Sequence, residues 1–432
     1  MSEHRSPIGE NTGGFDKITA RAVAVMVIAA MVYMFAAFQY ISPPVVALGI
    51  SQSLGLGPDD MGLMFSATFI AYALMQPLAG FGADRFGPRR CLMFSTALTA
   101  VASIWFSRAG SLGSAATARA LVGLAAGFAF VPTIRLAANW LPVRHFGMAS
   151  SLVVAASALS SFLAGAPLAF FAGGFGWRWS FMMLGLISAG LCLIVWRVVK
   201  DRPASARPAA AGAGSPGSNF GSAAKIVLTN PVFWLMSLVY CGVDLIYQVF
   251  TGLWAGPYLI EGYGLSMAEA GSMLSTASVG LLFGGPLMIL LANAWKSYTK
   301  MIITLAAFNV GLAAFLVWGP ADAPLWMIRL LCLAAPVGAQ GTALFFAVGR
   351  RIFPEQIVGT MTGFLNMVPF LFGAAMQSLT GRMLAGIRAD HVYQDLGAHF
   401  QYSLAFKPIL YCVLASLAAG FWLHAKAGTK ES

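Results

Sequence analysis

The sequence predicts an all-α membrane protein with twelve transmembrane helices in two pseudo-symmetric six-helix bundles. Only 9% of its 432 residues are charged and 59% are hydrophobic, whereas an ordinary soluble domain is about 25% charged. The apolar runs are about 20 residues long and uninterrupted, the length that an α-helix needs to cross a bilayer core of about 30 Å. Strands of a membrane barrel would instead alternate over about ten residues. Helices are therefore the predicted spanning elements.

Twelve apolar runs follow one another along the chain, and each is long enough for one span. We expect helices at residues 20–42, 61–81, 89–107, 116–138, 147–171, 180–199, 231–255, 268–292, 300–318, 324–347, 358–381 and 401–423. The five cysteines all fall within these runs, so disulfides and thiolate metal sites are not expected. The first run is a full span after a polar start, and we therefore expect no cleaved signal peptide.

Basic residues define the expected orientation. An even number of spans places both termini on one side, and 19 of the 26 basic residues fall in the segments on that side, against four in the opposite loops. Because Lys and Arg concentrate in cytoplasmic loops, we expect a multi-pass protein of the cell inner membrane with both termini in the cytoplasm. The net charge of +11 then reflects topology and lipid contact, and no nucleic-acid partner is expected.

The chain divides into two similar halves. A stretch rich in Ala, Gly, Pro and Ser predicts a flexible cytoplasmic linker at 201–228, between bundles at 1–200 and 229–432. An offset of 209 residues relates Gly62 and Ser66 to Gly271 and Ser275. The same offset relates Pro77 to Pro286, and an offset of 210 relates Arg119 to Arg329. Shared composition of membrane helices is the alternative explanation, but repeated halves are typical of transporters that bind solute at the interface between them.

A motif follows the second span: Gly80-Phe-Gly-Ala-Asp84-Arg85-Phe-Gly87-Pro-Arg89-Arg90. Three arginines in a cytoplasmic loop are also what the topology alone would produce. With its spacing, however, the motif resembles the loop between helices 2 and 3 of the major facilitator superfamily. Arg119, Gly123 and Gly127 match the helix 4 pattern of that family, and the resemblance extends over essentially the whole chain.

The resemblance implies a mechanism and several roles. Gly80, Asp84, Arg85, Gly87, Arg89 and Arg90 would form a cytoplasmic gate that latches the outward-open state. Helices 1, 4, 7 and 10 would line the central cavity, and the protein would act as a monomer. The second copy of the loop has Asn293 in place of the acid, so the latch would be asymmetric. Helix 5 has Gly165-Ala-Pro167 without the glycine run of the family's antiporters, which weakens an antiporter assignment.

Asp244 is the only carboxylate near the middle of an apolar span. An ionised carboxylate there costs at least about 3 kcal/mol, so the group must be neutral, paired or in contact with water. Such an acid suits a proton carrier or a reader of substrate charge, and a structural salt bridge is the alternative. Aromatic and amide side chains that suit a solute pocket occur in the same helix and in helix 1: Tyr240, Tyr247, Gln248, Trp254, Tyr33, Gln39 and Tyr40. Tyr40 and Trp254 equally suit an interfacial belt.

Arg119 and Arg329 begin helices 4 and 10 at corresponding positions. Two guanidinium groups can clamp an anion, whereas snorkelling to lipid headgroups or pairing with Asp244 are the alternatives. Gln340 and Asn366 are polar residues in apolar runs that suit the pocket or interhelical hydrogen bonds. His391, Asp395 and His399 would share one helical face and form a weak metal candidate, although Gly397 interrupts the helix.

The sequence therefore predicts a secondary active transporter that moves a small polar solute, such as an organic anion or metabolite, by proton-coupled alternating access. It contains no arrangement typical of an enzyme, and no cofactor is expected. Two alternatives remain open: an exporter of amphipathic compounds or metal chelates, and a non-transporting membrane sensor or assembly factor.

Overall fold

The computed structural model describes residues 19–141, 146–203, 220–354, 357–393 and 395–427, and its secondary structure there is helical without strands. Helices of the first half are α1 (Ala20–Ile41), α2 (Pro43–Leu54), α3 (Pro58–Phe86), α4 (Pro88–Ser107), α5 (Leu112–Gly127), α6 (Phe130–Trp140), α7 (Phe146–Ala164) and α8 (Ala166–Val198). Those of the second half are α9 (Phe220–Leu228), α10 (Pro231–Ile246), η2 (Tyr247–Trp254), α11 (Ala255–Pro257), η3 (Tyr258–Gly262), α12 (Met267–Ser275), α13 (Ala277–Ala294), α14 (Tyr298–Trp318), α15 (Leu325–Ala339), α16 (Thr342–Ile352), α17 (Val358–Ala389), α18 (Ala398–Ala405) and α19 (Lys407–Ala427).

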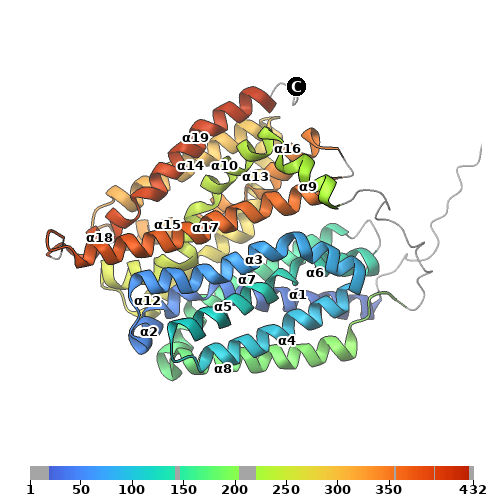
Figure 1. The fold of residues 1–432 in the computed structure, drawn as a ribbon, viewed down its shortest axis with the longest axis horizontal. Helices are drawn as coiled ribbons and strands as arrows, with labels where there is room; N and C mark the ends of the chain where they lie inside the picture. The colour runs from blue at the N-terminus through green and yellow to red at the C-terminus, as the bar shows by residue number, and fades with distance from the viewer. Residues whose placement is uncertain (1–18, 142–145, 204–219, 355–356, 394, 428–432) are drawn as a thin grey trace, which may run out of the picture.

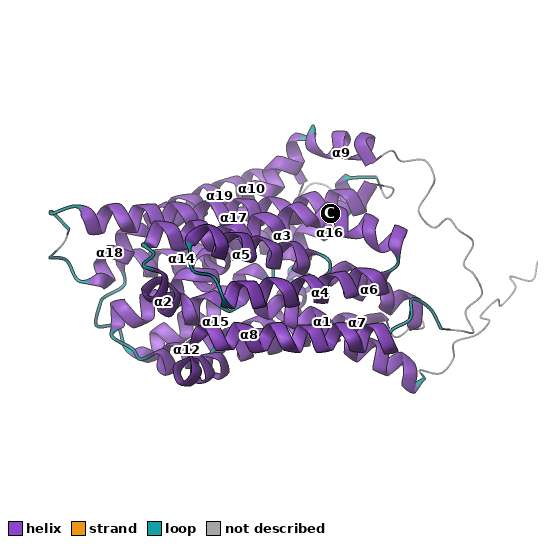
Figure 2. Cartoon of the chain, turned by 60° about the horizontal axis from the view of Figure 1, so that its bottom comes forward, coloured by secondary structure: helices purple, strands orange, loops and turns teal. Residues whose placement is uncertain are grey.

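The two halves form two bundles that lie side by side (Figures 1 and 2). The beginning of α1 and the ends of α8 and α19 lie at one end of the molecule, called the linker end below. The turn between α2 and α3 and helix α18 lie at the opposite end. This common placement of helix ends follows from an even number of crossings in each half.

Eleven helical segments in the described residues are long and apolar enough to span a membrane. One of them, Leu152–Val198, contains 47 residues, roughly twice the length that one crossing needs. Gly176 interrupts it with a φ of +80°, a conformation that favours glycine. The segment therefore makes two crossings, which brings the number of spans to the predicted twelve.

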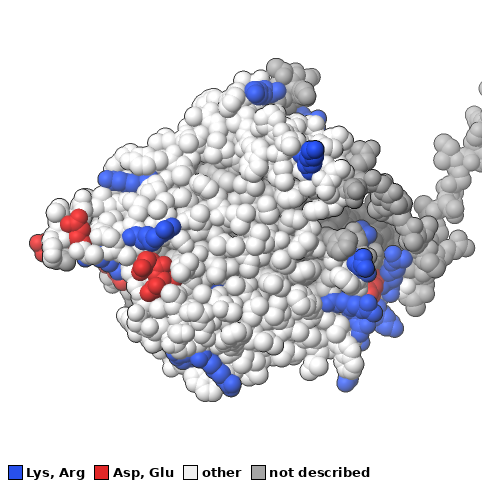
Figure 3. Space-filling model, viewed as in Figure 1, with Lys and Arg blue, Asp and Glu red and all other residues white. Residues whose placement is uncertain are grey.

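Charged side chains leave a wide apolar region on the surface of the molecule. On the face drawn in Figure 3, Lys, Arg, Asp and Glu gather towards the two ends, and the surface between them is almost free of charge. Large apolar side chains cover the flanks, including Phe170, Phe283 and Leu290, which are all more than 60% exposed. Such a surface is favourable in contact with lipid and unfavourable in contact with water.

The helices differ from the expected spans in ways that the sequence explains. Helix α2 continues the first span beyond Ser42, because Pro43 suits the first position of a new helix. Helix α9 occupies the end of the expected flexible linker, where buried Ala223 and Val227 give the segment an apolar face. The last nine residues of the expected linker are therefore helical, and residues 204–219 lie outside the described residues.

The breaks and prolines of the two halves correspond. The fourth span divides between α5 and α6, and the tenth divides at the equivalent place between α15 and α16. Pro77 and Pro286 lie inside α3 and α13, which are equivalent helices. Two bundles with matching irregularities confirm the pseudo-symmetric fold inferred from the offset of 209 residues.

The equivalent glycines and serines join the halves. Ser66 of α3 accepts a hydrogen bond from Ser378 of α17 (3.0 Å between hydroxyl oxygens), and Ser275 of α12 accepts one from the backbone N–H of Ala166 at the start of α8 (2.7 Å). One turn away from each serine, Gly62 and Gly271 allow the helix backbones to approach closely. These two contacts, here called the glycine–serine seams, connect the halves in the part of the bundle away from the linker end.

Candidate functional site

Asp244 lies in the last turn of α10 and is 5% exposed, so its carboxylate does not face lipid. Gln248, one turn later, donates a hydrogen bond from Nε2 to Asp244 Oδ2 (2.8 Å). The amide oxygen of Gln248 is buried without a hydrogen-bond partner among the described residues. A buried acid with one neutral donor, and with an unused acceptor beside it, is a group that can gain or lose a proton in response to a ligand.

The helix that carries Asp244 changes its winding directly after it. Residues 247–254 and 258–262 have π-helical turns, which are rare and often mark functional sites. Gln377 of α17 holds the first of these segments, because its Nε2 donates to the carbonyl oxygen of Gln248 (2.8 Å). Trp254 Nε1 donates in turn to the carbonyl oxygen of Gln377 (3.4 Å). The wide turns thereby direct Gln248 and Thr251 towards the other half.

Phenol groups from both halves lie in the neighbourhood of the acid. Tyr240 and Tyr247 of the second half, and Tyr40 and Tyr72 of the first, lie within range of its charge. Tyr240 is itself fixed, since its hydroxyl lies 2.6 Å from Thr342 Oγ1 and 3.4 Å from Asn366 Oδ1. The carboxylate therefore lies at the interface between the bundles.

A small cavity marks the contact between the halves beside Gln248. Its walls are formed by Tyr40, Ile41, Phe69, Tyr247, Gln248, Thr251, Gly252 and Phe370. The ring of Phe370 lies 4.7 Å from that of Tyr72 and 6.0 Å from that of Phe69. The space open to the centre of a water molecule is about 10 Å³, which is about the room that one water needs. This arrangement of the site is too tight for an organic solute.

Tyr33 lies in the same layer of the first half. It is half-buried, packs against Phe130 with ring centroids 5.6 Å apart, and is hydrogen-bonded to Ser157. Gln39 turns away from the cavity, into the first bundle, where its Nε2 donates to Ser103 Oγ (2.8 Å). Tyr33 thus lies in one cluster with Tyr40 and Tyr72, whereas Gln39 lies behind the cavity wall.

Arg119 is completely buried in the first bundle. Its Nη2 donates to the Gln39 carbonyl oxygen (2.9 Å) and its Nε to Thr68 Oγ1 (3.2 Å), while Nη1 has no hydrogen-bond partner among the described residues. The guanidinium lies between the rings of Phe65 and Phe106, 5.2 and 5.6 Å from their centroids. Gln39 and Thr68 directly precede Tyr40 and Phe69 of the cavity wall. The charge of Arg119 therefore lies one layer behind the interface.

The two arginines at equivalent positions have different environments. Arg329 is exposed on α15, whereas Arg119 is enclosed, so they do not form one clamp in this arrangement. Gln340 lies at the break between α15 and α16 and packs against Gly284 and Gly285 of α13. Trp254 is 3% exposed and contacts Gln377, so it does not form part of an interfacial belt.

The loop motif at the linker end is held by the end of the sixth span. Asp201 Oδ1 accepts a hydrogen bond from the backbone N–H of Arg89 (2.7 Å) at the start of α4, and Arg89 Nη2 donates to the carbonyl oxygen of Trp196 (2.5 Å). Gly87 has a φ of +82° and separates α3 from α4. Arg85 and Arg90 are exposed. Gly80 and Asp84 lie within α3, and the side chain of Asp84 is outside what the structure describes. The described hydrogen bonds of Arg89 stay within the first half.

The three residues of the metal candidate do not converge. His391 and Asp395 are exposed, whereas His399 is buried and its Nε2 lies 3.1 Å from the hydroxyls of both Tyr258 and Tyr263. Within the described ranges, no group of three His, Cys, Asp or Glu side chains is placed to hold a metal ion. The weak metal hypothesis for this loop therefore has no geometric support.

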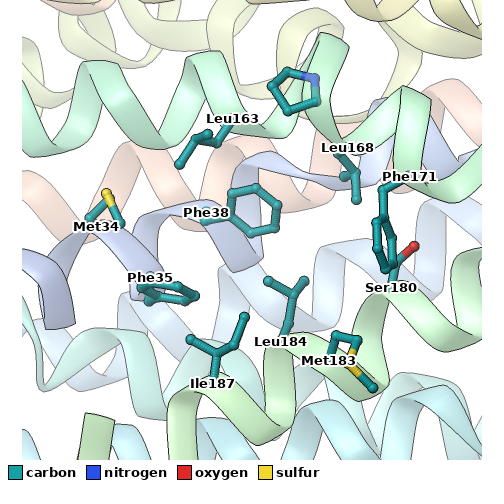
Figure 4. Close-up of a pocket in the computed structure, with 11 residues that line it drawn as sticks. Met34, Phe35, Phe38, Leu163, Leu168, Phe171, Ser180, Met183, Leu184 and Ile187 are labelled. Carbon is teal, nitrogen blue, oxygen red and sulfur yellow. The ribbon is translucent and has the colours of Figure 1, made fainter. Parts of the chain in front are cut away.

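A larger cavity lies inside the first half and not at the interface. It is about 230 Å³ in volume, and its lining of Met, Phe, Leu, Ile and Pro side chains from α1, α7 and α8 includes Ser180 as the one polar residue. Phe35, Phe38 and Phe171 point into it (Figure 4). The Ser180 hydroxyl already donates to the Gly176 carbonyl oxygen (2.9 Å). A wall without free polar groups does not suit a small polar solute.

Sequence reasoning missed several residues of the interface. Phe69 and Tyr72 come from α3 and Phe370 comes from α17, whereas we expected the lining from the first, fourth, seventh and tenth spans. The repeated Gly62 and Gly271 were the available signal, because glycine in a membrane helix indicates close approach of a partner. Gly62 lies where the second and eleventh spans meet, and this contact brings their neighbouring aromatic residues into the interface.

Comparisons with known proteins agree with this architecture. The model of the Major Facilitator Superfamily matches residues 25–378. The crystal structure of a bacterial homologue of the human lysosomal transporter Spinster, inward-facing and unoccupied, is similar with a TM-score of 0.75 and 18% identity, over 95% of this chain and 98% of that one. That likeness supports the fold.

Curated relatives include transporters and a sensor. A probable sulfoacetate transporter of Cupriavidus necator is 31% identical over 40% of this chain and 40% of its own length. The membrane sensor protein UhpC of Salmonella typhimurium is 26% identical over 81% and 80% of the two chains. A probable galactarate/D-glucarate transporter of Escherichia coli is 24% identical over 79% and 82%. Because the family model covers most of the sequence and the fold agrees with it, the chain belongs to the Major Facilitator Superfamily.

Proposed function

We propose that the protein is a proton-coupled transporter of a small organic anion, which works by alternating access between its two bundles. The observation that carries the proposal is the buried carboxylate of Asp244, which lies among phenol groups of both halves. The names of relatives that handle sulfoacetate or galactarate and glucarate support the substrate class. We further propose the inner membrane as its location, with the linker end in the cytoplasm, where most basic residues fall.

Coupling follows from repulsion between like charges. An ionised Asp244 and an anionic solute repel each other strongly where little water is present. Protonation of Asp244 removes that repulsion, and the hydroxyl and amide donors of Tyr33, Tyr247 and Gln248 then remain to bind the anion. The solute and the proton therefore move together. Arg119 lies one layer behind this wall and adds a positive potential that favours an anion.

The test is uptake of radiolabelled sulfoacetate and galactarate into proteoliposomes with an imposed pH gradient. One pH unit across the membrane supports up to about tenfold accumulation for one proton per solute. Asp244→Asn is expected to abolish gradient-driven accumulation while leaving exchange of preloaded solute. The matched control is Asp322→Asn, which changes an exposed acid. Accumulation by Asp244→Asn equal to that of the wild type would refute the coupling role.

A second candidate function is solute sensing without transport, which the similarity to a membrane sensor favours. A sensor binds its ligand without moving it. Binding of a labelled anion by the purified protein, with neither accumulation nor exchange in vesicles, would support this candidate over transport.

A further inference from the structure

At the end opposite the linker, a charged pair lines a second cavity between the halves. Glu261 of η3 and Arg388 of α17 form an ion pair with 2.6 Å between Oε2 and Nη2. Together with Tyr402 they face a cavity of about 110 Å³, whose other walls include Ala47, Ser51 and Pro58 of the first half. The site is thus shared by both bundles, like the site around Asp244.

The donors around Glu261 are arranged as a carboxylate receptor. The Tyr402 hydroxyl donates to Glu261 Oε2 (2.6 Å), the same oxygen that accepts from Arg388. Gln401 Oε1 accepts from Arg388 Nε (3.3 Å), and the guanidinium lies 5.5 Å from the centre of the Tyr402 ring. The guanidinium is therefore oriented from two sides. A planar guanidinium and a phenol that converge on one oxygen bind a carboxylate or sulfonate well.

The ion pair is only partly enclosed. The side chains of Arg388 and Glu261 are 32% and 28% exposed, and pairs that are open to solvent contribute little to stability. The cavity beside them has room for several water molecules. A solute anion can therefore reach the pair, and exchange of one carboxylate for another on Arg388 does not require unfolding of the surrounding helices.

We propose that Arg388 and Tyr402 form an entrance site for the anionic solute, in which Glu261 occupies the place of the solute's acid group until the solute displaces it. This inference rests on the proposed function, because it takes the solute to be an organic anion. Glu261 then sets the affinity of the entrance site. It keeps Arg388 oriented in the empty protein and makes binding at the entrance weak, so that the solute can move on to the site around Asp244.

The experiment measures equilibrium binding of radiolabelled sulfoacetate to the purified full-length protein and to two variants. Glu261→Gln keeps an acceptor for Tyr402 and Arg388 but leaves the guanidinium charge unopposed, so Kd is expected to fall by roughly fivefold. Arg388→Gln removes the cation and is expected to raise Kd by a similar factor. Arg388→Lys keeps the charge without the planar fork and is expected to lie between the wild type and Arg388→Gln.

Opposite shifts in the two main variants support the proposal. A merely structural ion pair would weaken binding in both variants together with their melting temperatures, and that result would overturn it. Unchanged binding in both variants, or no binding even by Glu261→Gln, would overturn it as well. Uptake by the wild type separates failure of the entrance site from failure of the proposed function. Transport by the wild type, with unchanged binding in both variants, rejects the entrance site alone. Binding without transport rejects the proposed function.

Discussion

The glycine–serine seams make the equilibrium between the two orientations of the bundles sensitive to a single methyl group. A Cβ atom added at Gly62 would lie 2.8 Å from the Gln377 carbonyl oxygen and 3.1 Å from Ser378 Cα, both in the other half. An ordinary contact is 3.4–4 Å, so the backbones must separate by about 0.6 Å. Because both neighbours are backbone atoms, side-chain rotation cannot relieve the clash.

Overpacking of this kind costs about 1–3 kcal/mol. The cost falls on the arrangement in which the seam is closed, and it disappears when the halves separate there. Gly62→Ala is therefore expected to shift the equilibrium about 5- to 150-fold towards the arrangement that is open opposite the linker. The equivalent substitution, Gly271→Ala, is expected to act in the same direction, since its Cβ would lie 2.5 Å from Ala169 Cβ.

Two controls separate this shift from a general loss of stability. A Cβ at Gly185 would meet Ile104 Cγ1 at 2.6 Å and the Ala100 carbonyl oxygen at 3.1 Å, within one half. Gly185→Ala should therefore lower the melting temperature without moving the halves apart. Gly173 has no atom within 4 Å of such a Cβ, and Gly173→Ala should change neither property.

The assay is a distance measurement between paired spin labels in a variant without the five native cysteines. One pair, at exposed Ser111 and Asp322, reports on the end opposite the linker, and a second pair, at exposed Arg202 and Lys300, reports on the linker end. Gly62→Ala should lengthen the first distance and shorten the second. Equal distance distributions in Gly62→Ala and Gly173→Ala would refute the reasoning.

Two further predictions concern side-chain hydrogen bonds, and both are read from the melting temperature of the purified protein. Asp201→Ala removes the hydrogen-bond acceptor at the start of α4 and should lower the free energy of unfolding by about 0.5–2 kcal/mol. The control Asp322→Ala, at an exposed loop, should leave it unchanged. An unchanged melting temperature in Asp201→Ala would contradict the prediction. His399→Phe keeps an aromatic ring but removes Nε2, which is within hydrogen-bond distance of the hydroxyls of Tyr258 and Tyr263, and should cost about 1–3 kcal/mol. In a double-mutant cycle with Tyr263→Phe the two losses should not add, and simple additivity would show that the contact is not energetically coupled.

The number of spans, the halves and the position of Asp244 were predictable because each depends on residues close in sequence. A run of apolar residues indicates a span by its length, and one acid in such a run stands out at once. The environments of Arg119 and Arg329 were not predictable in this way. Their equivalence under the offset suggested a shared role, but the first is surrounded by Gln39, Thr68 and two Phe rings, which come from three other helices.

The partners of the loop motif and of the histidines were hidden for the same reason. Asp201 is 112 residues from Arg89, and no local pattern connects them. His399 shares a helical face with His391 only if the helix is continuous, whereas residues 391–393 and 395 form turns and α18 begins at Ala398. A periodic pattern thus predicted neighbours correctly within a helix and failed where the chain left it.

The π-helical turns of the seventh span have a consequence for the numbering of this helix. An α-helix rotates by about 100° per residue, and a wide turn accommodates an extra residue without passing on that rotation. Loss of one residue between Tyr247 and Trp254 would therefore let the segment tighten to α-helical winding without turning the part beyond it. Trp254 would keep its contact with Gln377, and Glu261 would still point at Arg388. Loss of one residue from the α-helical Ala255–Pro257 would instead turn Glu261 by about 100°, away from Arg388. The site around Asp244 and the entrance beyond it therefore keep their relative orientation only when a change of length falls within the wide turns.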